Sequence, residues 1–206
     1  MPVIWGRTNS VNVQKVTWCC EEMAIDYDRI DAGRTFGVVD TPAYRNLNPN
    51  GLVPTLVDDG FVLWESNAIV RYLAAKHGAG SLWPDDPRTR ANADRWMDWK
   101  ITTFWPAIHA LFLGLVRTPP DQRDAQAIET SRLKTAEVLR IVDAHLRLHP
   151  FLAGDAFTMG DIPLGCGIWR WMTLPIERPE LPNLERWFAS LKERPAYKKI
   201  VMLPLS

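Results

Sequence analysis

Long apolar runs are absent from this chain of 206 residues, and its first residues show no basic stretch followed by an apolar one. A membrane-spanning helix needs ~18 consecutive apolar residues, which no segment reaches. A leader peptide needs a basic region followed by an apolar one. The sequence therefore predicts a cytoplasmic protein with no membrane partner.

Charge of one sign is nowhere in excess. Lys and Arg together number 24, Asp and Glu also number 24, and the two signs are mixed along the chain without a basic block. Proteins that bind nucleic acid usually carry a basic patch that follows the phosphate backbone. We therefore expect no nucleic-acid partner.

Cysteine is scarce as well. The chain has Cys19, Cys20 and Cys166, an odd number in which two are neighbours, and it has no CxxC spacing. This pattern fits neither a disulfide framework nor a zinc site built from paired CxxC ligands. It indicates a reducing compartment, no bound metal, and three cysteines with structural roles inside helices.

Alternating strand and helix patterns fill the first third of the chain. Hydrophobic residues make up 47% of the composition, enough for a sizeable core, and Asp58-Asp59-Gly60 has the composition of a hairpin turn. This order predicts an α/β domain with the topology β-α-β-α-β-β-α. The expected elements are strand 3–5, helix 13–24, strand 27–30, helix 41–47, strands 55–57 and 61–64, and helix 66–76.

A segment rich in Gly, Pro and Asp, GAGSLWPDDP, separates this region from a second one. Strand signals nearly vanish beyond it, and helical periodicity predicts an all-α domain. We expect residues 1–77 to form the first domain, 78–87 a linker and 88–206 the second domain. The expected helices are 88–116, 125–148 and 161–172, with a final pair after Pro182 and Pro195.

The segment NPNGLVPTLVDDGFVLWESNAIVRYLA, residues 48–74, combines two features that suit an amino-acid ligand. A cis bond before Pro54 would present the backbone of Val53 to an extended peptide. Ser66, at the start of a helix, would offer a hydroxyl and free backbone amides to a carboxylate, and Glu65 would attract an amine. Each feature also has an ordinary explanation, because Ser66 suits an N-cap, Glu65 a first-turn acid and Pro54 a trans bond in an edge loop.

Residues 48–56, NPNGLVPTL, and residues 63–69, LWESNAI, resemble the glutathione-binding core of the cytosolic glutathione S-transferases. The resemblance covers nearly the whole chain and is strongest to bacterial, serine-type (theta-like) members. It implies a thioredoxin-like first domain with a mixed four-stranded sheet, followed by the all-α domain. It also implies that Val53 and Pro54 hold the cysteinyl part of glutathione, while Glu65 and Ser66 hold its γ-glutamyl part.

The turn after the first strand is the expected catalytic position. By the same resemblance, Ser10 donates a hydrogen bond to the sulfur of glutathione, with Asn12 as a second donor and Thr8 as a rival to Ser10. A free thiol with a pKa of about 8.5 is only slightly ionised at neutral pH, and a hydroxyl at a helix start favours the thiolate. Glutathione is thus expected as co-substrate, with no metal.

The same resemblance implies an apolar electrophile bound between the two domains, against a stripe of residues at helical spacing. Leu52 replaces the polar residue that many relatives use to hold the glycyl end of glutathione. The favoured function is glutathione transfer to this electrophile by a homodimer. The alternatives are a glutathione-dependent disulfide reductase or peroxidase, or a noncatalytic interaction module. The candidate electrophile site comprises Trp105, Ile108, His109 and Phe112.

Overall fold

In the computed structural model, which describes residues 1–206, the first part of the chain forms a four-stranded sheet in the order β2-β1-β3-β4. Strands β1 and β2 run parallel, whereas β3 is antiparallel to both β1 and β4. The expected mixed four-stranded sheet is confirmed. The strands are β1 (Val3–Trp5), β2 (Asp28–Ile30), β3 (Thr55–Asp58) and β4 (Phe61–Trp64).

Local turn and capping chemistry explains where these elements begin. Asp59 and Gly60 both have positive φ, 49° and 83°, which suits the tight hairpin between β3 and β4. Thr41 accepts a hydrogen bond from the backbone N–H of Tyr44 at 3.3 Å and so caps the helix that begins at Pro42. The helices of this part are α1 (Val11–Glu22), η1 (Arg34–Phe36), α2 (Pro42–Leu47) and α3 (Ser66–His77).

The rest of the chain is helical, as expected, and no strand follows β4. The predicted helix 88–116 is a continuous helical run whose middle, Lys100–Phe104, is a π-helical segment, η2. None of the helices combines the length and apolar character that crossing a membrane requires. The helices are α4 (Pro87–Trp99), α5 (Trp105–Val116), η3 (Pro120–Gln122), α6 (Ala125–Leu146), α7 (Asp161–Thr173), α8 (Pro182–Glu193) and α9 (Pro195–Ile200).

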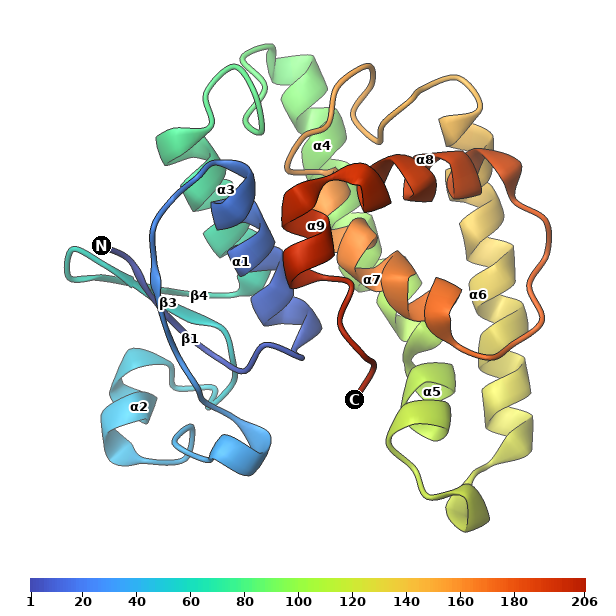
Figure 1. Cartoon of the computed structure of the whole chain (residues 1–206), viewed down its shortest axis with the longest axis horizontal. Helices are drawn as coiled ribbons and strands as arrows, with labels where there is room; N and C mark the ends of the chain where they lie inside the picture. Colours follow the sequence, from blue (N-terminus) through green and yellow to red (C-terminus); the bar gives the residue numbers. More distant parts are fainter.

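The two parts share one hydrophobic core. Helix α1 packs on α3 within the first part and on α7 and α9 of the second. In Figure 1, α1 lies between the sheet and the helical part, while α2 stands apart from the other helices. Charged groups add to this contact, since Arg194 pairs with Glu22 at 2.6 Å and Lys199 pairs with Glu21 at 2.7 Å. The position of α1 relative to the helical part is therefore fixed by packing on both sides.

A buried carboxylate holds the start of α7. Asp161 accepts hydrogen bonds from the backbone N–H of Leu152 at 2.9 Å and of Thr158 at 3.0 Å, and from the indole N–H of Trp187 at 2.9 Å. Burial nevertheless raises the pKa of Asp161 to about 6. One side chain thus joins the loop before α7 to α8.

Candidate active site

The loop before β3 presents the backbone of one residue. The Val53–Pro54 peptide bond is cis. The carbonyl of Leu52 accepts hydrogen bonds from the hydroxyl of Tyr44 at 2.6 Å and from the side-chain amide of Asn48 at 2.9 Å, which fixes the loop. Neither the N–H nor the C=O of Val53 has a backbone partner, so both are available to an extended peptide.

The start of α3 carries the Glu65-Ser66 pair. Glu65 is exposed and holds the N-cap position with φ of 69°, a backbone conformation that non-glycine residues adopt only rarely. Ser66 is therefore the first residue of the helix and not its cap. Its hydroxyl accepts a hydrogen bond from the ammonium of Lys15 at 3.1 Å and keeps its own proton to donate.

Lys15 is a buried residue of the site that the sequence patterns did not single out. Its ammonium donates to the side-chain carbonyl of Asn67 at 3.1 Å as well as to Ser66, and burial lowers its pKa to about 8. Lys100 lies beside it, and burial together with the charge of Lys15 lowers the pKa of Lys100 well below its ordinary value. A lysine inside an otherwise apolar helix face was the signal available in the sequence.

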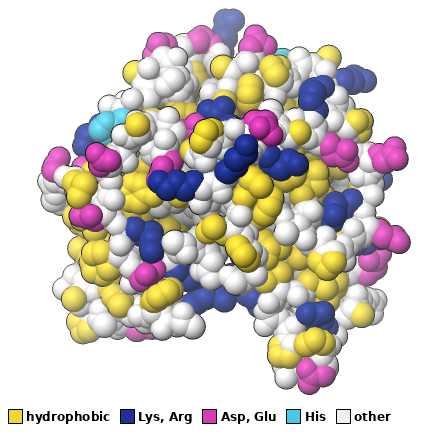
Figure 2. All heavy atoms as spheres, in the orientation of Figure 1, with side chains coloured by type: hydrophobic (Ala, Val, Ile, Leu, Met, Phe, Trp, Pro, Cys, Tyr) yellow, Lys and Arg dark blue, Asp and Glu magenta, His cyan; other side chains and the backbone are white.

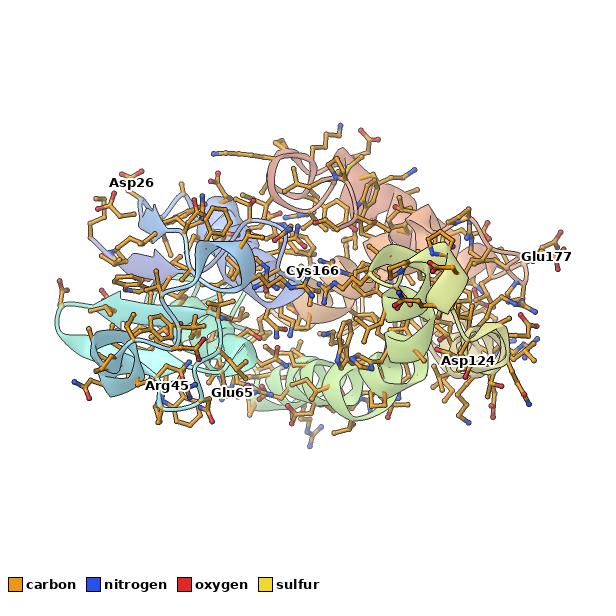
Figure 3. The ribbon with its side chains drawn as sticks, turned by 90° about the horizontal axis from the view of Figure 1, so that it is seen from below. Asp26, Arg45, Glu65, Asp124, Cys166 and Glu177 are labelled. Atoms are coloured by element: carbon orange, nitrogen blue, oxygen red, sulfur yellow. The ribbon has the colours of Figure 1, made fainter.

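Two neighbouring hollows connect these segments. A small pocket touches Pro54, Glu65 and Ser66, and a larger cleft continues from it to Ser10, sharing Asn12, Leu52 and Val53 with the pocket. In Figure 3, Glu65 lies toward the lower edge of the molecule, while Cys166 lies near its centre. The carboxylate and hydroxyl of the pocket and the open backbone of Val53 therefore line one continuous surface.

The first turn of α1 closes this surface. Ser10 is only 6% exposed and occupies the N-cap position, yet its hydroxyl makes no capping hydrogen bond and lines the cleft. Asn12, two residues further along the chain, lines both hollows, whereas Thr8 is exposed and lines neither. The positive end of the α1 dipole points toward the same place. Ser10 and Asn12 are thus placed to donate to an anion in the cleft.

The four candidate electrophile residues occupy different environments in the structure: some lie at the cleft and others in the core. Trp105 lines the cleft, and the exposed ring of His109 meets it edge-on with centroids 5.5 Å apart. Ile108 is fully buried in the core, and Phe112 is 1% exposed. Ile108 and Phe112 therefore do not line the cleft as expected, because this stripe of α5 faces α6 and α7.

Arginines line the cleft alongside apolar residues such as Val11, Leu52 and Trp105. Arg7, Arg34 and Arg117 line the cleft together with Ser10 and Trp105. In Figure 2, basic side chains gather at the roof of the notch between the two lower lobes, which carry α2 and the lower end of α5 in Figure 1. Sequence reasoning did not identify these arginines. Only the position of Arg7 in the same turn as Ser10 hinted at a role.

Comparisons with known proteins agree with this geometry. The family described as "Glutathione S-transferase, N-terminal domain" matches residues 9–76, and "Glutathione S-transferase, C-terminal domain" matches residues 104–195. Glutathione S-transferase GstB of Escherichia coli (strain K12) is 45% identical over 208 residues, which cover 100% of both chains.

Solved structures give the same result. The theta class glutathione S-transferase from the citrus canker pathogen Xanthomonas axonopodis pv. citri, with glutathione bound, matches with a TM-score of 0.96 and 53% identity, covering 100% of this chain and 99% of the other. Glutathione transferase F2 from Populus trichocarpa matches with a TM-score of 0.88 and 26% identity, over 98% and 97% of the two chains. The present chain therefore belongs to the glutathione S-transferase family, as its motifs predicted, and is an enzyme of that family.

Proposed function

We propose that this enzyme conjugates glutathione to an electrophile, with the thiolate stabilised by Ser10. The observation that carries the proposal is the free hydroxyl of Ser10, which faces the same surface as the open backbone of Val53 and the Glu65-Ser66 pair. A tripeptide bound to Val53 through its cysteinyl backbone would direct its γ-glutamyl end to Glu65 and Ser66 and its sulfur to Ser10.

Charge complementarity supports this orientation. The γ-glutamyl carboxylate would accept from the hydroxyl of Ser66, whose oxygen already accepts from Lys15, and the free N-terminal amides of α3 would add to the attraction. The γ-glutamyl ammonium would meet the exposed carboxylate of Glu65. Lys15 acts as a positioning residue, because it orients the Ser66 hydroxyl without reaching the ligand.

The chemistry requires a hydrogen-bond donor to sulfur and no general base. The thiol proton leaves to solvent, the thiolate attacks the electrophilic carbon, a C–S bond forms, and the leaving group departs with its electron pair. Each unit by which the thiol pKa falls corresponds to ~1.4 kcal/mol of preferential thiolate stabilisation. One charge-assisted hydrogen bond from Ser10, with the α1 dipole and Asn12, is of that order.

The cysteines of the chain do not suit a thiol mechanism of their own. Cys19, Cys20 and Cys166 are all buried, and burial raises the pKa of each thiol above its ordinary value. We therefore expect a variant with all three replaced by Ala to keep glutathione-dependent turnover while losing some stability. Loss of turnover in a variant that stays folded would require a cysteine mechanism in place of Ser10.

The test of the proposed function has two stages. Retention on immobilised glutathione, with elution by free glutathione, measures binding, and a panel of haloarenes, epoxides, peroxides and mixed disulfides measures the chemistry. We expect retention and conjugation of the haloarenes or epoxides. Turnover confined to mixed disulfides or peroxides would favour a reductase or peroxidase, and retention without any turnover would favour an interaction module.

We also propose a cytoplasmic homodimer, as the family resemblance implies. Asp94 is the residue we would place near the γ-glutamyl amine of a partner subunit. Within one chain its carboxylate accepts from Arg71 at 2.6 Å, and Arg71 also bonds Asp98 at 2.6 Å. Sedimentation at several protein concentrations measures the oligomeric state.

A further inference from the structure

Three arginines from distant parts of the sequence meet at the cleft. Arg7 belongs to the turn before α1, Arg34 to η1 after β2, and Arg117 to the C-terminal end of α5, and all three line the cleft that contains Ser10. Like charges brought together in this way repel one another. Burial lowers the pKa of Arg7, and the charge of Arg34 lowers it further. Burial, with the charges of Arg34 and Arg7, lowers the pKa of Arg117 to about 10.

None of these three arginines forms an ion pair, although Arg29, Arg45 and other arginines of the chain do. The acidic residues that flank Arg34 in sequence are already engaged. Asp31 pairs with Arg29 at 2.5 Å, and Asp40 pairs with Arg45 at 2.9 Å. No carboxylate side chain of the protein therefore pairs with the cluster.

Some hydrogen-bond donors of the three arginines also have no partner in the protein. The Nε atoms of Arg7 and Arg117 are buried and have no hydrogen-bond partner. Arg117 donates one hydrogen bond, at 3.4 Å, to the main-chain oxygen of Ser206, the last residue of the sequence, and its guanidinium lies over the ring of Phe112 at 5.1 Å. Buried polar groups in folded proteins are nearly always bonded, so these two donors are available to a ligand in the cleft.

Arg170 provides a comparison inside the same protein. It is buried, its guanidinium lies 5.6 Å from the centre of the Phe112 ring, and it has protein partners. Its guanidinium donates to the carbonyl of Cys166 at 2.8 Å and to the side chain of Gln14 at 3.0 Å. A structural arginine in this protein is thus satisfied by protein oxygens, and Arg7 and Arg117 differ from it in this respect.

We propose that the electrophile conjugated by this enzyme carries a carboxylate, which Arg7, Arg34 and Arg117 bind while its apolar body lies against Trp105. The inference rests on the proposed function. Planar guanidinium groups bind carboxylates through paired, charge-assisted hydrogen bonds.

The glycyl end of glutathione is a second source of the same carboxylate chemistry. Arg7 and Arg34 belong to the first part of the chain, as do the residues assigned to glutathione. Arg117, however, follows α5, the helix that carries Trp105, and its position favours the electrophile. Reaction with a chloronitroarene then forms a C–S bond at the ring carbon and releases chloride, while the carboxylate stays unchanged.

The decisive experiment measures binding of two reaction products that differ in one group. Calorimetry compares S-(4-carboxy-2-nitrophenyl)glutathione with S-(4-carbamoyl-2-nitrophenyl)glutathione on the wild type, Arg7→Gln, Arg117→Gln and Arg117→Lys. Arg140→Gln is the matched control, because Arg140 is exposed on α6 away from the cleft. We expect the wild type to bind the carboxylate conjugate about tenfold or more tighter than the carbamoyl conjugate. Arg117→Gln should reduce this preference by about tenfold, and Arg117→Lys should keep part of it.

Activity provides an independent readout. The ratio of catalysed to uncatalysed rate should be higher for 4-chloro-3-nitrobenzoate than for 4-chloro-3-nitrobenzamide, and Arg117→Gln should lower the first ratio far more than the second. Arg140→Gln should change neither ratio.

Other results would overturn the inference, each in a recognisable way. Equal binding of both conjugates by the wild type would reject the carboxylate site while leaving the proposed function standing. If Arg117→Gln weakened glutathione itself, but not its glycyl amide, the arginines would hold the glycyl carboxylate instead. Failure of glutathione and both conjugates to bind would overturn the proposed function and this inference with it.

Discussion

Replacing Ser10 with Ala should raise the pKa of the bound glutathione thiol while changing the affinity for glutathione little. The Ser10 hydroxyl makes no hydrogen bond within the protein, so its removal deprives no other group of a partner. The grip on the γ-glutamyl end lies elsewhere, at Glu65 and Ser66. Ser10→Ala should therefore change the thiol pKa without a matching change in the affinity for glutathione.

The magnitude follows from the kind of bond and from its surroundings. Ser10 is 6% exposed, so water has little access to replace the lost donor. A hydrogen bond to a charged sulfur is worth ~1.5 to 3 kcal/mol, which equals about one to two pKa units. Turnover at pH 7 should fall by about tenfold or more and should recover in part as pH rises toward the new pKa.

The assay is the pH dependence of thiolate ultraviolet absorbance in the glutathione complex. Thr8→Ala is the matched control, since Thr8 lies in the same turn but is exposed and does not line the cleft. Asn12→Ala and the double variant with Ser10→Ala measure how far the second donor compensates, because neighbouring donors to one atom are not additive. A titration that Ser10→Ala leaves unmoved, while Thr8→Ala or Asn12→Ala shifts it, would refute the assignment.

Three further variants test the surroundings of the site. Ser66→Ala should weaken glutathione binding by ~1.5 to 3 kcal/mol, and unchanged affinity by calorimetry in a folded variant would contradict its role. Lys15→Met should weaken glutathione binding yet stabilise the unliganded fold at pH 7 by about 1 to 3 kcal/mol, because it removes a buried charge whose pKa is lowered to about 8. The stability gained by Lys15→Met should shrink between about pH 8 and 10.5, because in this range the wild type keeps its Lys15 proton when unfolded and loses it when folded. If urea unfolding gave the same stability difference at every pH, the buried charge of Lys15 would not be its cause. Asp161→Ala should lower the free energy of unfolding by about 3 to 5 kcal/mol, because three buried donors lose their acceptor, and a loss below about 1 kcal/mol in the same assay would show that the loop rearranges.

Much of the fold was determined by the sequence itself. Apolar residues at period two or 3.6 mark the buried faces of strands and helices, and turn chemistry such as Asp58-Asp59-Gly60 limits where the elements end. The predicted strands 3–5 and 61–64 therefore match β1 and β4 residue for residue. The glutathione motifs were readable for the same reason, since residues 53–54 and 65–66 act through backbone groups and a helix start that local sequence specifies.

Only the tertiary structure determined which residues line the part of the cleft assigned to the electrophile. A helical stripe shows which residues share a face, but not whether that face meets solvent, a cleft or another helix, and so Ile108 lies in the core while Trp105 lines the cleft. Arg7, Arg34 and Arg117 come together only because the end of α5 faces the first part of the chain across the cleft, and no local pattern encodes the distance between residues so far apart in sequence. Local periodicity specifies elements, whereas long-range packing decides which charges share a cleft.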